Sequence, residues 1–153
     1  MRTGTRLGVD VGKVRVGVAR SDPHGMLATP VETVQRASGS IRKILARAAE
    51  YDAVELVVGL PIALSGRDTA STADARTFAQ ELADESELPV RLVDERMTTM
   101  SANSALRASG RNAKNSRSVV DQVAAVIILQ HALDFERSAA KPPGELVEPT
   151  QGS

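Results

Sequence analysis

The sequence contains no cysteine, no tryptophan and only two histidines, His24 and His131. The absence of cysteine excludes disulfide bonds, thiolate catalysis and cysteine-ligated zinc or iron–sulfur centres. The two histidines cannot form an HExxH zinc motif, and they offer few ways to build a serine–histidine relay. If the chain is an enzyme, carboxylates acting with a hard divalent cation are the best remaining chemistry.

Aromatic residues and net charge are also scarce. Aromatic side chains make up 2% of the chain, and 19 basic residues balance 19 acidic ones. Since Phe78 falls on the apolar stripe of a predicted helix, we do not expect a surface for stacking nucleic-acid bases. A zero net charge provides no global attraction to nucleic acid, so any such binding must come from local basic clusters.

Long hydrophobic runs are missing too. The longest wholly apolar stretch is residues 123–129, far short of a membrane span. Residues 1–12 carry charges and lack the apolar segment of a signal peptide. We therefore expect a cytoplasmic protein that does not bind membranes.

The length and composition fit one globular domain. The chain has 153 residues, of which 42% are hydrophobic and 25% charged. We expect this domain to span residues 1–140. Residues 141–153 are rich in proline, glycine and glutamate, so we expect a disordered tail there.

The first third of the chain has the alternating pattern of β-strands. Apolar residues alternate over 7–11 and 14–18, and a third strand is predicted over about 27–34. A two-residue turn at Gly12-Lys13 would place Arg15 opposite Asp10. The turn before the third strand is expected at residues 22–25.

The rest of the chain alternates helices with strands. Helical spacing occurs near 41–51, 75–82, 98–107 and 118–137, and short apolar strands occupy 54–59 and 90–93. The order β-β-β-α-β-α-β-α-α predicts an α/β fold with a mixed five-stranded sheet and helices on both faces.

Acidic residues on three separate elements are the candidate chemistry. Asp10 interrupts an apolar strand, and its simpler role is a salt bridge to Arg15. Asp121 lies on an otherwise apolar helix, where it could instead stabilise the helix N-terminus. Asp94 and Glu95 end a strand at the edge where open α/β sheets bind ligands, although either could instead cap the next helix or pair with Arg96.

Clustered carboxylates repel one another unless cations lie between them. Mg²⁺ or Mn²⁺ suits such an all-oxygen site, and two ions can activate water and stabilise the leaving oxygen of a phosphodiester. Basic residues near these acids would contact phosphates, although dispersed basic side chains are usually solvated surface. The candidates are Lys13, Arg15, Arg96, Lys114 and Arg117.

A glycine-containing turn follows the strand at 54–59. Gly59 and Pro61 could let a phosphate approach the backbone. An ordinary connection from strand to helix would explain the same residues equally well.

Five segments of the chain resemble one known family. Its motifs match in order and spacing over about residues 6–133, through LGVDVG (7–12), RVGVA (15–19), VVGLP (57–61), VDERMTT (93–99) and VDQVAA (120–125). These segments resemble the YqgF/RuvX family. The resemblance implies an RNase H-like fold and a cytoplasmic nuclease that processes the 5′ end of pre-16S ribosomal RNA. The alternative that it implies is a Holliday junction resolvase.

Matched by position, three acids resemble the family's metal-binding and catalytic carboxylates. They are Asp10, either Asp94 or Glu95, and Asp121. Glu95 is favoured because its longer side chain can reach back over the sheet edge. The implied partners are pre-rRNA or branched DNA and ribosomal precursor particles, with the protein a monomer or homodimer.

Two other readings stay open. One is a non-catalytic nucleic-acid-binding module in ribosome assembly. The other is a nucleotide phosphotransferase, but such folds need a second similar domain, and this chain is too short to supply it.

Overall fold

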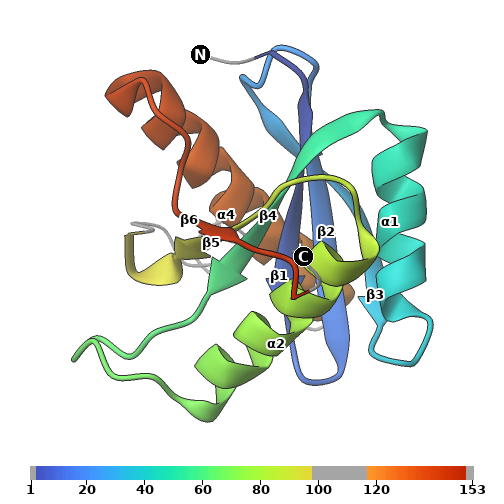
Figure 1. The fold of residues 1–153 in the computed structure, drawn as a ribbon, viewed down its shortest axis with the longest axis vertical. Helices are drawn as coiled ribbons and strands as arrows, with labels where there is room; N and C mark the ends of the chain where they lie inside the picture. The colour runs from blue at the N-terminus through green and yellow to red at the C-terminus, as the bar shows by residue number, and fades with distance from the viewer. Residues whose placement is uncertain (1–2, 98–116, 151–153) are drawn as a thin grey trace.

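The computed structural model describes residues 3–97 and 117–150, with side chains on the last helix described from Gln122 onward (Figure 1). In chain order the elements are β1 (Thr5–Val11), β2 (Arg15–Ser21), β3 (Ala28–Gln35), α1 (Ser40–Glu50), β4 (Ala53–Leu60), α2 (Ala70–Glu85), β5 (Val90–Asp94), the 3₁₀ turn η1 (Glu95–Met97), α4 (Arg117–Ala139) and β6 (Glu145–Val147). The predicted helix over 98–107 lies outside the described residues. None of the described helices has the length and hydropathy needed to cross a bilayer.

The sheet is mixed, as predicted, but it has six strands in the order β3-β2-β1-β4-β5-β6. β1, β4 and β5 run parallel, and β2, β3 and β6 pair antiparallel to their neighbours. Because β1, β4 and β5 are adjacent and parallel, their carboxyl ends meet at one edge. That edge carries Asp10, Gly59 and Glu95.

The β1–β2 hairpin differs from the predicted register. The Gly12 N–H donates to the Arg15 carbonyl oxygen at 2.9 Å, so the turn residues are Lys13 and Val14. The residue opposite Asp10 is Gly17, so the predicted register, with Arg15 opposite Asp10, is wrong. The shift is two residues and leaves every side chain on its original face, which is why alternation alone could not distinguish the two registers.

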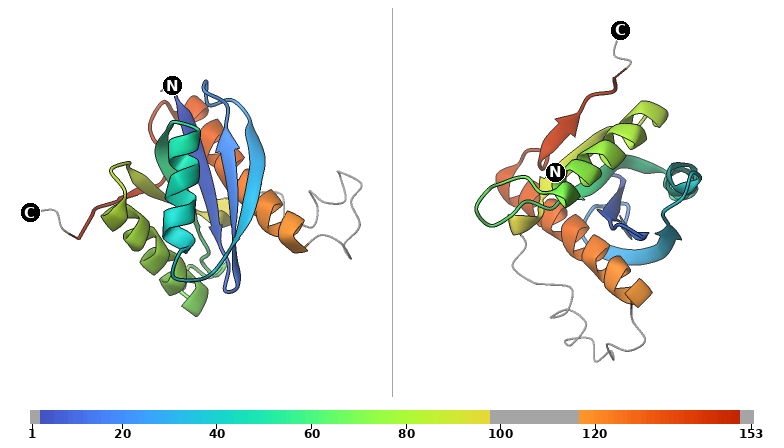
Figure 2. Two further views of the ribbon diagram at one scale, coloured as in Figure 1. Left: turned by 90° about the vertical axis from the view of Figure 1, so that its right-hand side faces the viewer. Right: turned by 90° about the horizontal axis from the view of Figure 1, so that it is seen from below.

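Helices cover both faces of the sheet, as expected (Figure 2). On one face, α1 and α2 pack on alternate aliphatic side chains of the central strands, including Val9, Val18 and Val58. On the other face, α4 packs against Val57 and Val93 and is the one helix among the described residues that does so. Since side chains alternate along a strand, residues next to these core positions can be assigned to a face from their neighbours.

Helix α4 lies very close to β1 because a glycine faces it. A Cβ atom added at Gly8 would lie 2.7 Å from the Leu129 Cβ and 3.1 Å from the Ala125 carbonyl oxygen. No side chain fits in that space. The Gln122 amide donates to the Thr33 hydroxyl at 3.1 Å, which ties the first half of α4 to β3.

The sixth strand comes from the tail that was expected to be disordered. Glu145–Val147 pairs with β5, and Gly144 precedes it at φ +66°, where a Cβ would lie 2.1 Å from the Leu92 carbonyl oxygen. The expected disorder is therefore wrong for this segment. The strand forms because the edge of β5 offers unpaired backbone groups. Three residues in a segment rich in proline and glycine are too few to predict a strand from the sequence.

Replacing Gly8 with alanine should destabilise the fold by about 1–3 kcal/mol, the usual cost of overpacking a core. The added methyl would push α4 away from β1. Urea unfolding checks this, with Gly39→Ala as the control, because nothing lies within 4 Å of a Cβ at Gly39. Equal stabilities for the two variants would contradict the close approach of α4.

Candidate active site

Asp10 lies near the carboxyl end of β1 on the face covered by α4. Val9 packs on the opposite face, and Gly8, two residues before Asp10, faces Leu129 of α4. Val9 pairs with Val58, so the next residue along each strand, Asp10 and Gly59, lie side by side on this face. The Asp10 side chain is half-buried.

The Glu95 carboxylate lies above Gly59. A Cβ added at Gly59 would be 2.9 Å from the Glu95 Oε2 atom and 2.5 Å from the Ile128 Cδ1 atom. Glu95 opens η1 directly after β5, and this turn directs its side chain back over the sheet toward α4. The missing side chain of Gly59 leaves the space that the carboxylate fills, next to the strand that carries Asp10.

The environment of Glu95 favours its neutral form. Burial raises the pKa of the carboxyl above its ordinary value of 4.5, and the charge of Asp94 raises it further. Within residues 3–97 and the described part of α4, no group forms a hydrogen bond or ion pair with this carboxylate. An added cation would therefore find an uncompensated oxygen ligand.

Asp94 has a different environment. Its carboxylate pairs with the Arg96 guanidinium through contacts of 2.7, 3.0 and 3.1 Å and accepts the Arg96 backbone N–H at 2.8 Å. These hydrogen bonds hold the pKa of Asp94 below its usual value. Of the two adjacent acids, the structure thus places Glu95 on the face of Asp10 and ties Asp94 to Arg96.

Asp121 occupies the fifth position of α4, which begins at Arg117. It lies one turn before Ala125, which is fully buried against the sheet, so this position continues the stripe of α4 that faces β1. The Asp121 side chain lies outside the described residues. The backbone shows that Asp121 follows the first turn of the helix and is not its N-cap.

The predicted phosphate-binding residues are dispersed. Lys13 is exposed in the hairpin turn, Arg15 is half-buried at the start of β2, and Arg96 is exposed. Lys114 lies outside the described residues, as does the side chain of Arg117.

The turn after β4 has clear structural roles. The Pro61 carbonyl accepts a hydrogen bond from the Thr72 hydroxyl in the first turn of α2. The space above Gly59 is filled by Glu95 and Ile128. The role of this glycine is to leave room for those two side chains, which the sequence analysis did not predict. The available signal was a glycine inside an apolar strand, which often marks a close approach.

The described residues contain no group of three acidic or histidine side chains arranged to hold a metal ion. Asp10 and Glu95 supply two carboxylates on one face, and Asp121 lies on α4, the helix that packs on this face. This donor set would suit a hard divalent cation that prefers oxygen ligands.

A family model described as "RuvX: Holliday junction resolvase" matches residues 4–135. The chain belongs to the RuvX family. The predicted family membership is therefore confirmed over most of the chain.

Curated relatives of this RuvX-family chain share most of its sequence. A protein of Clavibacter michiganensis subsp. michiganensis is 66% identical over 150 residues, covering 96% of this chain and 93% of the relative. A protein of Leifsonia xyli subsp. xyli is 60% identical over 154 residues, covering 99% of both chains. Each is named "Putative pre-16S rRNA nuclease".

Solved structures support the predicted RNase H-like fold. Thermus thermophilus RuvC in complex with a Holliday junction substrate superposes with a TM-score of 0.57 at 14% sequence identity, covering 92% of this chain and 99% of the other. A second structure of the same RuvC gives a TM-score of 0.52 at 13% identity. At such low identity the likeness concerns the fold alone.

Replacing Glu95 with glutamine should raise Tm at neutral pH when EDTA removes divalent cations. Because the folded-state pKa of Glu95 is raised, its contribution to stability is full below pH 4.5 and is lost as pH rises through the folded pKa. The Tm gain of the variant should therefore be small near pH 4 and larger at pH 7. Differential scanning calorimetry measures it; a lower Tm for the variant at pH 7 would show a cationic partner for Glu95.

Proposed function

We propose that this RuvX-family chain is a divalent-cation-dependent nuclease that hydrolyses phosphodiester bonds in structured nucleic acid at the Asp10–Glu95 face. The observation that carries the proposal is the Glu95 carboxylate above Gly59, beside Asp10 and without an ion-pair partner among the described residues. Burying an ionisable group in this way costs stability, so a role in binding a cation explains its retention.

The residues present fit Mg²⁺ or Mn²⁺. Asp10 and Glu95 would hold the ion from the sheet, and Asp121 would approach it from α4. The bound cation would polarise the phosphodiester and its attacking water. The chain's own contribution is to fix two carboxylates on adjacent strand ends and to exclude bulk water from one side with Ile128.

The basic residues would bind the nucleic-acid backbone. Lys13 lies in the hairpin turn after Asp10, and Arg96 follows Glu95. Arg117 begins α4, and Lys114 precedes it in sequence. Lys13 and Arg96 border the same end of the sheet as Asp10, so they would contact phosphates on either side of the cleaved bond, and we propose the same role for Lys114 and Arg117.

The preferred substrate is the 5′ end of pre-16S rRNA within ribosomal precursor particles, by transfer from relatives that are 60% and 66% identical. A second candidate substrate is a DNA Holliday junction, which the family description favours. Cutting a junction symmetrically would require two copies of the chain, whereas trimming an RNA end requires one.

Three single substitutions test the site: Asp10→Asn, Glu95→Gln and Asp121→Asn should each lower cleavage by about 100-fold or more, because each removes a charged cation ligand. End-labelled pre-16S RNA and a four-way DNA junction are incubated with Mg²⁺ or Mn²⁺, or with EDTA, and the cuts are mapped. Asp134→Asn, an exposed acid later on α4, is the matched control and should cut at the wild-type rate. Binding without metal-dependent cuts by the wild type would favour the non-catalytic module instead.

A separate comparison decides between the two adjacent acids. Asp94→Asn should keep cleavage within about tenfold of wild type, since its carboxylate pairs with Arg96 instead of facing Asp10. Glu95→Gln should lose far more. The reverse order in the same assay would identify Asp94 as the cation ligand.

A further inference from the structure

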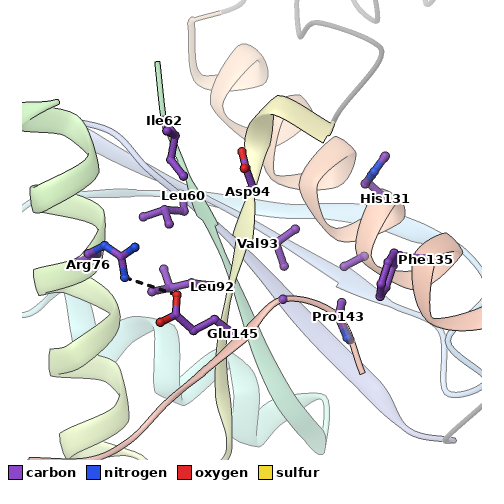
Figure 3. Close-up of a pocket in the computed structure, with 12 residues that line it drawn as sticks. Leu60, Ile62, Arg76, Leu92, Val93, Asp94, His131, Phe135, Pro143 and Glu145 are labelled. Carbon is purple, nitrogen blue, oxygen red and sulfur yellow. Dashed lines mark hydrogen bonds and ion pairs between the residues drawn. The ribbon is translucent and has the colours of Figure 1, made fainter. Parts of the chain in front are cut away.

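A cavity of about 290 Å³ lies beside the end of β5, and neither Asp10 nor Glu95 lines it (Figure 3). This base pocket, as we call it, has mostly apolar walls, formed by Leu60, Ile62, Leu92, Val93, Ala132 and Phe135. Its size is close to the lower end of the range for small-molecule sites in proteins, about 300–1,000 Å³. It can therefore accept a flat ring but little more.

The base pocket adjoins the proposed active site through two consecutive residues. Asp94 lines the pocket, whereas the next residue, Glu95, reaches over Gly59 on the α4 face. A ligand in the pocket would therefore lie just past the strand end that holds the cleavage site.

Phe135 is the aromatic residue available for stacking. Of the three aromatic residues in the chain, Tyr51 has the Arg20 guanidinium 4.5 Å from its ring centroid, and Phe78 has that of Arg36 at 5.1 Å. Phe135 instead lines the base pocket from α4, near His131 (Figure 3). The expectation that no surface stacks nucleic-acid bases was argued from Phe78, which packs in the core, and not from Phe135.

The polar groups of the pocket disfavour a phosphate. Arg76 already pairs with Glu145 at 3.4 Å, and the second carboxylate, Asp94, pairs with Arg96 at 2.7 Å. Both arginines at this rim are therefore already paired with carboxylates, whereas the second oxygen of Glu145 can accept a hydrogen bond from an amino group. A neutral heterocycle with an exocyclic amino group meets both the apolar walls and the carboxylate rim.

We propose that the base pocket receives an unpaired nucleobase of the substrate, one that carries an exocyclic amino group, next to the cleaved phosphodiester. The inference rests on the proposed nuclease function and adds to it a means of recognising the substrate. The base stacks on Phe135 and donates its amino hydrogens to Glu145. Uracil and thymine lack that amino group and fit less well.

Nucleoside binding tests the pocket without any cleavage. Adenosine, cytidine, guanosine, uridine and inorganic phosphate are titrated into the full chain, and the NMR signals of Val93 and Ala132 are followed. The three amino-bearing nucleosides should shift these signals, with uridine about tenfold weaker and phosphate without effect. Equal responses to uridine, responses to phosphate or no responses at all would overturn the assignment.

Phe135→Leu should weaken nucleoside binding about tenfold by removing the stacking ring while keeping apolar bulk. Tyr51→Leu removes an aromatic ring outside the pocket and should bind like wild type. A cooperative thermal unfolding transition in each variant, as in the wild type, establishes that both variants fold. If Phe135 proves essential for folding, Arg76→Ala at the exposed rim serves instead and should change the ranking of the nucleosides. Equal binding by all variants would refute the pocket.

Cleavage then links the pocket to the reaction. A substrate with one abasic position next to the cut should lose about tenfold in kcat/KM with wild type and far less with Phe135→Leu, since that variant has already lost the stacking contact. An equal loss of kcat/KM in wild type and Phe135→Leu would show that the base pocket does not take part in cleavage. If Asp10→Asn cleaves normally while nucleosides still bind, the proposed active site fails and the base pocket stands.

Discussion

The contact between α4 and the sheet is the constraint on which the rest of this molecule depends. It is made through positions without side chains, Gly8 and Gly59, so the helix lies closer to the strands than larger residues would allow. This approach brings Ile128 over Gly59 and confines Glu95 between helix and sheet. It also fixes the stripe of α4 on which Asp121 lies. The close packing of α4 on the sheet therefore determines where these acids lie.

The position of Glu95 costs stability. Burial raises the pKa of its carboxyl and so disfavours the ionised form, which the proposed role in binding a cation requires. The adjacent Asp94 follows the opposite logic, because its pairing with Arg96 stabilises its charge. Neighbouring acids with opposite environments are typical of sites where one carboxylate is structural and the other is kept available for chemistry.

Much of the fold was readable in the sequence because it follows hydrophobic periodicity. The last helix was predicted over 118–137 and observed at Arg117–Ala139, and the first three strands were placed within a few residues. The prediction of the hairpin register was wrong because a shift of two residues leaves every side chain on the same face of the sheet, so the alternating pattern fits both registers. The sixth strand was not predicted because Glu145–Val147 forms by pairing with the edge of β5, and its own three residues show little alternating pattern.

The sequence by itself determined the order of the first five strands and of α1, α2 and α4, the family, and the candidate acids Asp10, Asp94, Glu95 and Asp121. These follow from local patterns that the chain carries wherever it folds. Only the tertiary structure placed Glu95, and not Asp94, on the face of Asp10. It did so because a 3₁₀ turn after β5 redirects the side chain, and because a glycine on the neighbouring strand leaves it room. The redirected Glu95 side chain and the space above Gly59 come together only when β4 and β5 lie side by side.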